Sequence, residues 1–375
     1  MIRAAQTVVS LLAAFALSAA HAQLTIGGTF TATGNNASIG IPCKNTMEIM
    51  PATIAGQQVK YVILDDGGDP SVAVKNMRKL TQEDKVDVVI GSNSPPTCLA
   101  MNDVALEMKT AQLCLAPLPM RNPWAFSVPH AVPIMVDGVV GHMKANNVKT
   151  VAFIGFADVW GDQNYDAIMK LAPPAGIKVL GNERYARTDT SVNAQILKIL
   201  AAGPDAVFIG GASTPGALPS IALAERGYKG RVYHTHGVIN RDFLRVGGKA
   251  LEGIVAPSGP FVVADQLPDS NPIKKVALAY KKSYEAKFGA GSANPFGAYS
   301  WDAYVWLNAA IPVALKKGKP GSPEFRTALR EALESLKDVV GTNSVYNLSP
   351  GNHNGMDQGS RVLVRVENGA FKLLP

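Results

Sequence analysis

The sequence predicts an α/β fold of two doubly wound, Rossmann-like lobes joined by a multi-strand hinge. Short runs rich in Val, Ile and Phe alternate with helical patterns from residue 24 onward. Such alternation is typical of parallel sheets that helices cover on both faces. The alternation runs in two rounds, over 24–129 and again from about residue 149. Proline- and glycine-rich segments at 129–133 and 257–260 end the two rounds, and we interpret them as crossovers between lobes.

The strand candidates are short and apolar, which is the pattern of strands buried on both faces. They cover residues 24–30, 59–64, 86–90, 113–116, 151–155, 206–210 and 231–234. Near the end of the chain, Asn368-Gly369 separates two β-like runs, 361–367 and 370–374. This dipeptide is the strongest local hairpin signal in the chain, so we expect a hairpin there.

Helices are predicted between the strands from apolar spacing and capping residues. A helix over 72–80 is preceded by Asp69 as a cap and by Pro70 in its first turn. A second helix, over 191–200, follows the capping candidates Asp189, Thr190 and Ser191. Three longer helices are expected at 272–288, 301–317 and 323–337.

These elements divide the chain into a leader and two discontinuous lobes. We expect a signal peptide at 1–22, a first lobe from 23–129 plus 261–342, and a second lobe from 130–260 plus 343–375. Two lobes of this size fit within the 375-residue chain.

The leader has the features of a secretory signal peptide. Arg3 precedes an apolar run over 8–20, and Ala20-His21-Ala22 places small residues where a signal peptidase cleaves. We expect cleavage after Ala22, which leaves Gln23 at the N-terminus. No cysteine follows the cleavage site, so no lipid anchor is expected. The sequence therefore predicts a soluble protein exported to the periplasm.

Composition excludes several other classes of function. The net charge of +7 is spread along the chain, and Lys316, Lys317 and Lys319 are explained by a solvated helix end. We therefore expect no nucleic-acid partner. After the leader, no stretch approaches eighteen uninterrupted apolar residues, so no stable membrane insertion is expected.

Three cysteines, Cys43, Cys98 and Cys114, follow the leader. An exported compartment permits a Cys98–Cys114 disulfide. The odd count leaves at least one thiol over, and the sequence contains no C-x-x-C motif. We expect buried free thiols in preference to the pair.

The candidate binding residues follow the predicted strands, because ligands of open α/β sheets lie beyond the carboxyl ends of strands. Ser94 and Thr97 stand where a helix over 99–109 begins, and their hydroxyls suit a carboxylate. Either residue could instead cap that helix. Pro95 and Pro96 lack an N–H, so the loop offers fewer donors than it might.

Further candidates stand after the strands of the second round. Ala212 and Ser213 begin a similar loop, and His236 follows the strand over 231–234. His236 could donate to an anionic or phenolic ligand or could be purely structural. Trp160 could stack on a ligand or cover the edge of the lobe.

Motifs of enzymes and metal sites are missing from the sequence. It lacks a G-x-S-x-G elbow, H-E-x-x-H and a phosphate-binding loop. His234 and His236 have no third ligand nearby, and the roles of capping and turn formation explain Asp65, Asp66 and Asp69. We expect no catalytic residue, no metal and no cofactor, and therefore not an enzyme.

The order of motifs resembles the type I periplasmic solute-binding proteins, specifically the leucine/isoleucine/valine-binding family of ABC transporters. The marks are the glycine- and threonine-rich segment 26–34, Asp65-Asp66 with Asp69-Pro70, Ile90-Gly91 before a hydroxyl-rich turn, 186–191, Gly227-Tyr228 and Gly237. The resemblance covers essentially the whole chain after the leader. It implies that first-lobe loops hold the ligand carboxylate and that the second lobe closes over it.

Together, the loops and the resemblance give one expected ligand site. Its residues are Ile39, Ser94, Pro95, Thr97, Leu118, Trp160, Ala212, Ser213 and His236.

Departures from the family pattern bear on the ligand. Amino-acid binders of the family usually have an acidic residue where His236 stands, a hydroxyl residue where Pro95 stands and a bulky aromatic where Ile39 stands. The usual disulfide between the segments at Gly68 and Ser94 has no cysteines here. A buried ammonium without a carboxylate is unfavourable. These departures indicate an organic anion without an amino group, namely an aromatic carboxylate or a 2-oxo acid.

The leading hypothesis is therefore a monomeric solute-binding protein that captures a small organic anion and delivers it to an ABC transporter permease. One alternative is a true leucine, isoleucine or valine binder. Another is the ligand-sensing subunit of a membrane receptor, which would use the same two-lobed closure.

Overall fold

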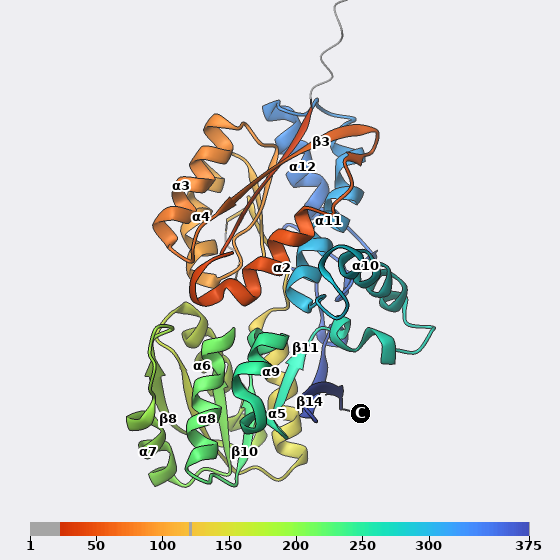
Figure 1. Cartoon of the computed structure of the whole chain (residues 1–375). Helices are drawn as coiled ribbons and strands as arrows, with labels where there is room; N and C mark the ends of the chain where they lie inside the picture. Colours follow the sequence, from red (N-terminus) through yellow and green to blue (C-terminus); the bar gives the residue numbers. More distant parts are fainter. Residues whose placement is uncertain (1–22, 120–121, 375) are drawn as a thin grey trace, which may run out of the picture.

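The computed structural model describes residues 23–119 and 122–374. Two α/β lobes lie one above the other, each with a central sheet between helices (Figure 1). Late in the chain, α11 and α12 return to the upper lobe, and β14 and β15 then end the chain in the lower lobe. The two-lobed α/β fold predicted from the sequence is confirmed. The signal peptide expected at 1–22 lies outside the described residues.

The first lobe contains a six-stranded sheet in the order β2-β3-β1-β4-β5-β6. Its strands are β1 (Leu24–Phe30), β2 (Thr53–Ile54), β3 (Gln57–Asp65), β4 (Val88–Gly91), β5 (Ala111–Cys114) and β6 (Ala125–Ser127). All neighbours pair in parallel except β2 and β3, which are antiparallel. The carboxyl ends of the parallel strands therefore meet at one edge of this sheet.

The second lobe contains a seven-stranded sheet in the order β15-β14-β11-β10-β9-β7-β8. Its strands are β7 (Thr150–Phe156), β8 (Lys178–Tyr185), β9 (Ala206–Gly210), β10 (Arg231–His234), β11 (Val255–Ser258), β14 (Val362–Glu367) and β15 (Ala370–Leu373). The hairpin predicted at Asn368-Gly369 is confirmed, and both residues have positive φ, as a tight hairpin turn requires. The sheet is not wholly parallel, because this hairpin adds two antiparallel strands to its edge.

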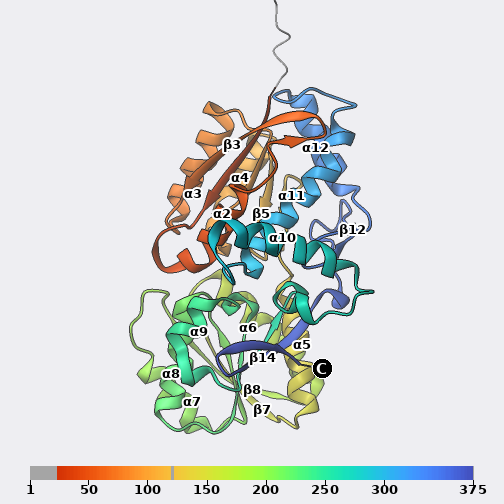
Figure 2. The same cartoon turned by 45° about the vertical axis from the view of Figure 1, so that its right-hand side comes forward.

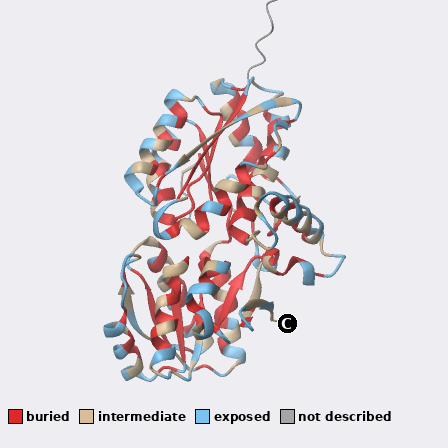
Figure 3. Ribbon diagram, viewed as in Figure 1, coloured by how far each residue is buried: buried red, intermediate tan, exposed pale blue. Residues whose placement is uncertain are grey.

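Helices cover both sheets, which explains why the central strands are buried along most of their length (Figure 3). The helices are α2 (Ala37–Met47), α3 (Pro70–Arg78), α4 (Pro95–Glu107), α5 (Val132–Ala145), α6 (Val159–Leu171), α7 (Asn193–Ala202), α8 (Leu218–Glu225), α9 (Arg241–Gly247), α10 (Pro272–Phe288), α11 (Pro295–Ala314) and α12 (Pro323–Glu334). Within the described part of the chain, no helix is both long and apolar enough to span a bilayer.

Several predicted boundaries differ from the structure for local reasons. The helix expected from residue 99 begins at Pro95, and the helix expected from 301 begins at Pro295. In the second case the Asn294 side chain caps the backbone N–H groups of Phe296 and Gly297. Conversely, α7 begins at Asn193, and its N-cap residue Val192 makes no side-chain cap. Of the expected capping residues, Ser191 contacts the helix start, where its Oγ accepts from the Asn193 backbone N–H at 3.4 Å.

The chain passes from the first sheet to the second between β6 and β7, and its last two strands, β14 and β15, again belong to the second sheet. Residues after 343 stay with the first lobe for some distance. The Tyr346 hydroxyl donates to Asp302 of α11 at 2.7 Å, and the His353 ring stacks on Phe126 of β6 at 4.2 Å. We therefore propose that the last crossover lies after Met356, later than the lobe boundary expected at 342–343. The remaining lobe boundaries stay predictions.

The expectation that Cys98 and Cys114 remain free thiols was wrong. They form a disulfide that joins α4 to the end of β5, and both are fully buried. Their Cα atoms lie 5.9 Å apart, which a disulfide can bridge. Cys43 remains a buried free thiol, and burial raises the pKa of its thiol well above the usual range.

Candidate functional site

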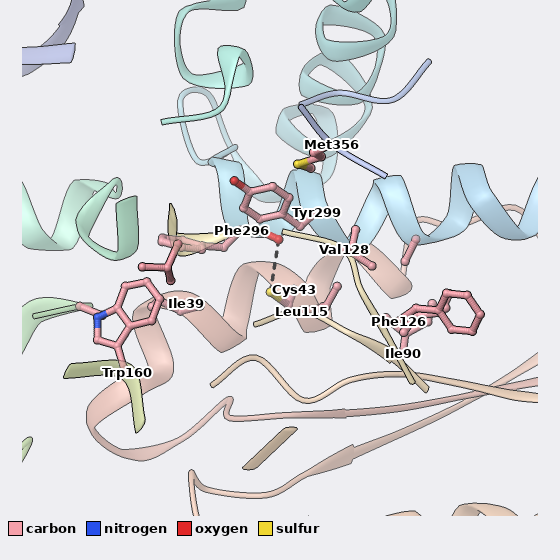
Figure 4. Packing of buried hydrophobic residues seen from close by; sticks show 14 of the residues in the cluster. Ile39, Cys43, Ile90, Leu115, Phe126, Val128, Trp160, Phe296, Tyr299 and Met356 are labelled. Carbon is pink, nitrogen blue, oxygen red and sulfur yellow. Dashed lines mark hydrogen bonds between the residues drawn. The ribbon is translucent and has the colours of Figure 1, made fainter. Parts of the chain in front are cut away.

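A cavity of about 410 Å³ lies between the lobes, at the carboxyl ends of the parallel strands. Its lining comes from both lobes and comprises Asn36, Ile39, Asn93, Ser94, Pro95, Leu115, Ala116, Pro117, Pro129, Trp160, Arg187, Ala212, His236, Gly237, Phe296 and Tyr299. Figure 4 shows that Ile39 comes from α2, Trp160 from the opposite lobe, and Phe296 and Tyr299 from the first turns of α11.

The loop between β4 and α4 brings polar groups to the first-lobe wall. Asn93 is fixed because its Oδ1 accepts a hydrogen bond from the Thr31 backbone N–H at 2.7 Å. Its Nδ2 is buried and lacks a partner in the described part of the chain. Ser94 occupies the N-cap position of α4 without capping it, because its hydroxyl bonds the Thr97 hydroxyl at 2.7 Å. Asn93 therefore presents an unused N–H donor to the cavity.

Trp160 and His236 form the wall of the second lobe. Their rings meet edge to face with centroids 5.2 Å apart, and the indole N–H donates to the Gly211 carbonyl at 3.2 Å. A Cβ on Gly237 would lie 2.7 Å from the Ala212 Cβ and 3.1 Å from the indole. Glycine at this position therefore lets the indole reach the cavity.

His236 is buried, and neither ring nitrogen has a partner among the described residues. Burial, with a smaller contribution from His130, lowers the pKa of His236 to about 3. In the empty cavity the ring is therefore neutral at physiological pH. A neutral imidazole offers one donor and one acceptor, and a ligand anion beside it would favour the doubly protonated form.

Arg187 is the one cationic residue that lines the cavity within the described residues. Asp158 accepts from its Nε at 2.6 Å through one carboxylate oxygen and caps α6 through the other. The guanidinium also lies 4.2 Å from the centroid of the Phe156 ring. Its Nη2 is buried without a partner. The arginine is thus held in place while one of its nitrogen atoms remains available.

Tyr299 closes the cavity on the first-lobe side. His130 Nε2 lies 2.6 Å from the Ser360 carbonyl, so this nitrogen carries the proton and donates. Burial lowers the pKa of His130 to about 4, which keeps the ring neutral. The His130 Nδ1 must then accept from the Tyr299 hydroxyl, 2.8 Å away. The hydroxyl oxygen of Tyr299 is left able to accept a hydrogen bond from a ligand.

The cavity brings together six of the nine residues predicted for the site. These are Ile39, Ser94, Pro95, Trp160, Ala212 and His236. Thr97 lies behind Ser94, and Leu118 packs on the Cys98–Cys114 cluster. Ser213 instead bonds Ser38 at 2.7 Å and the Asn35 carbonyl, and so joins the two lobes outside the cavity. That any of the nine contacts a ligand stays a prediction.

Four polar lining residues were missed from the sequence: Asn36, Asn93, Arg187 and Tyr299. Asn93 and Arg187 follow β4 and β8, so the strand-end rule could have identified both. Arg187 was overlooked because β8 was not recognised as a strand. It has only two adjacent aliphatic residues, Val179 and Leu180, followed by a largely polar run, since β8 forms an edge of the sheet and is partly exposed. No local signal connects Tyr299, on a distant helix, with this site.

In the described part of the chain, one basic side chain, Arg187, and several unpaired polar atoms give the cavity wall its polar character. No aspartate or glutamate lines it within the described residues, whereas Arg187, Asn93 and His236 offer donors. Most of the remaining wall is apolar. Among the same residues, no group of three or more His, Cys, Asp or Glu side chains is arranged to hold a metal ion.

Sequence comparison places this fold among known proteins. Residues 23–370 match a family model described as periplasmic binding protein. A Leu/Ile/Val-binding protein homolog of Brucella melitensis is 24% identical over 339 residues, which are 86% of each chain. A leucine-, isoleucine-, valine-, threonine- and alanine-binding protein of Pseudomonas aeruginosa is 27% identical over 74% of this chain and 72% of its own.

Solved structures are similar over nearly the whole described chain. An extracellular ligand-binding receptor from Rhodopseudomonas palustris is 42% identical and has a TM-score of 0.92, with 94% of this chain and 99% of that chain covered. A solute-binding protein of an ABC transporter from the same species, solved with benzoate, is 19% identical with a TM-score of 0.77. It covers 94% of this chain and 95% of its own, and at this identity it shows a common fold only.

Proposed function

The chain belongs to the type I periplasmic binding proteins of the branched-chain amino acid family, and we propose that its ligand is a small organic anion without an amino group. An aromatic carboxylate or a 2-oxo acid is the preferred class. In this proposal the protein is exported to the periplasm, where it captures the anion between its lobes and delivers it to the permease of an ABC transporter.

The observation that supports this ligand most strongly is the charge of the cavity wall. Leucine would bring an ammonium group into a cavity that no described carboxylate lines, and a buried ammonium without a counter-charge is strongly unfavourable. A carboxylate, in contrast, would find the free Nη2 of Arg187, the free Nδ2 of Asn93 and a ring nitrogen of His236. The cavity therefore complements the acid group and not the amine.

The rest of the wall suits a flat, apolar body. Ile39, Trp160 and Phe296 contribute large apolar surfaces from three different elements (Figure 4). An aromatic ring between such surfaces is removed from water and gains edge or face contacts with the indole. The hydroxyl oxygen of Tyr299 could accept a hydrogen bond from a hydroxyl group of the ligand.

Capture follows from the placement of these groups on both lobes. Asn93 belongs to the first lobe, and Arg187 and His236 belong to the second. A carboxylate bound by both lobes stabilises the closed arrangement relative to the open one. Each charge-assisted hydrogen bond contributes about 1.5–3 kcal/mol. Two such bonds with burial of a ring give a Kd of about 1 μM.

A branched-chain amino acid is the second candidate, because the curated relatives carry that specificity in their names. The fold is compatible with both an organic anion and an amino acid as ligand, because a structural neighbour with this fold was solved with benzoate. A thermal-shift panel of benzoate, phenylpyruvate and leucine on the purified protein separates them. We expect each of the two acids to raise the Tm more than leucine does. Stabilisation by leucine alone would overturn the proposal.

Replacement of the histidine tests the site itself. We expect His236→Ala to weaken binding of the stabilising acid at least several-fold by calorimetry, because a donor is lost from the second-lobe wall. Ser292→Ala, which alters an exposed loop, is the matched control. Unchanged affinity in His236→Ala would remove this residue from the site.

A further inference from the structure

A second cavity, of about 590 Å³, lies between the lobes beside the hinge. Asn240, Arg241 and Leu244 contribute its second-lobe wall, from the start and body of α9. Lys281 and Glu285 of α10 form the opposite wall. Helix α10 belongs to the first lobe, because its tyrosines pack on α2 and Figures 1 and 2 both show it there. This hinge cavity shares no lining residue with the first cavity.

Asn240 carries an unused donor in this cavity. Its side chain is only 4% exposed, and its Oδ1 accepts from the Phe243 backbone N–H at 2.9 Å to cap α9. That bond fixes the amide, yet its Nδ2 has no partner within the described residues. A buried donor of this kind destabilises the protein unless something else accepts its hydrogen bond.

An anion and a cation face the same space. One carboxylate oxygen of Glu285 is buried without a partner in the described part of the chain. Lys281, the other charged residue of α10 in the wall, is already paired with Asp265. The Arg241 guanidinium lies over Gly291, and its Nη1 donates to the Ala290 carbonyl at 3.5 Å. Glu285 and Arg241 are thus opposite charges on opposite lobes, each free to bind a ligand.

We propose that the hinge cavity is a second binding site whose ligand is a free α-amino acid. Its ammonium would donate to Glu285, and its carboxylate would accept from Asn240 and Arg241. Leu244, Phe261 and Phe371 provide apolar surface for a small side chain. Since the two walls belong to different lobes, the amino acid stabilises the closed arrangement and thereby raises the affinity of the first cavity for its acid. This last step rests on the lobe closure of the proposed function.

The test uses the full mature chain and calorimetry with three probes, namely L-alanine, glycerol and benzoate. The variants are Glu285→Gln, which removes the charge at constant shape, and Asn240→Ser, which retains a good helix cap but removes the amide N–H. Glu324→Gln, on the exposed start of α12, is the matched control, and His236→Ala reports on the first cavity.

We expect L-alanine to bind the wild type, the control and His236→Ala alike, and to bind Glu285→Gln and Asn240→Ser about tenfold more weakly or worse. We expect saturating L-alanine to lower the Kd for benzoate severalfold. Absence of alanine binding, or equal binding by glycerol, would overturn the inference.

The inference and the proposed function fail in different ways. Alanine binding that His236→Ala abolishes and Glu285→Gln preserves would place the amino acid in the first cavity and would overturn both. Benzoate binding without alanine binding would overturn the second site alone. Alanine binding that depends on Glu285, without any binding of an aromatic acid, would support the second site and contradict the proposed ligand of the first.

Discussion

At the scale of single residues, the first cavity depends on side chains that the protein holds rigid yet leaves partly unsatisfied. Asn93, Arg187 and Tyr299 line the cavity, and each is held by a hydrogen bond within the protein while part of its hydrogen-bonding capacity remains unused. Such preorganisation lowers the entropy lost on binding. The sequence identified His236 and Trp160 because they directly follow predicted strands, but it could not show which donors remain free.

Arg187 gives the sharpest test at this scale. We expect Arg187→Gln to weaken binding of the preferred acid by about tenfold or more, because a charge-assisted hydrogen bond and the local positive charge are both lost. Isothermal titration calorimetry at constant pH measures the change.

The control for this substitution is Arg245→Gln, which removes an exposed arginine whose ion pair with Asp242 is also exposed. Exposed pairs contribute little, so the control should bind like the wild type. Equal affinities in Arg187→Gln and the control would show that the carboxylate lies elsewhere.

At the scale of elements, the sequence predicts best where apolar runs and turn chemistry are local. The hairpin at Asn368-Gly369, α10 and the cap of α3 by Asp69 follow directly from such signals. Strand β8 was not predicted because it lies at a sheet edge and contains more polar than apolar residues. The position of residues 345–356 beside the first lobe depends on contacts with α11 and β6, which no local pattern encodes.

The Cys98–Cys114 disulfide links two elements whose loops line the first cavity. Ser94 and Pro95 begin the helix that carries Cys98, and Leu115 directly follows Cys114. We expect the double variant Cys98→Ser/Cys114→Ser to have a lower Tm, since closing a loop of this length stabilises by about 3 kcal/mol. We also expect weaker acid binding, because the two loops lose their covalent connection.

Thiol titration in denaturant checks the disulfide directly. Without reductant, the protein should expose one reactive thiol, from Cys43, and after reduction it should expose three. Three thiols before reduction would refute the pairing.

At the scale of the whole molecule, three buried histidines make stability depend on pH. Burial lowers the pKa of His130 to about 4 and the pKa values of His234 and His236 to about 3. The unfolded chain takes up protons below about pH 6.5 that the folded chain does not, so the free energy of unfolding falls as the pH decreases. Above about pH 6.5 these histidines do not make the free energy of unfolding depend on pH.

Asp302 acts in the opposite direction over part of this range. Burial raises its pKa to about 6, so the folded chain retains a proton that the unfolded carboxyl loses above about pH 4. We expect a net loss of stability between pH 6.5 and 4.5, since each histidine contributes up to about 1.4 kcal/mol per pH unit and Asp302 offsets one of the three. Urea denaturation across this range measures the slope.

The matched variant for the pH slope is His234→Gln, which can still bond the Ser220 hydroxyl. This variant should lower the slope of the unfolding free energy against pH by the contribution of about one bound proton. A free energy of unfolding that stays constant from pH 7 to pH 4.5 would contradict the buried, neutral state of these rings.

The central claim is that both lobes close on the carboxylate of one small acid. A crystal structure with the acid that most raises the Tm tests it most directly. The account predicts that the acid lies in the first cavity, with its carboxylate within hydrogen-bond distance of Arg187 Nη2 and Asn93 Nδ2 and its apolar body against Trp160. An acid found outside the gap between the lobes, or one whose carboxylate points away from Arg187, would contradict it.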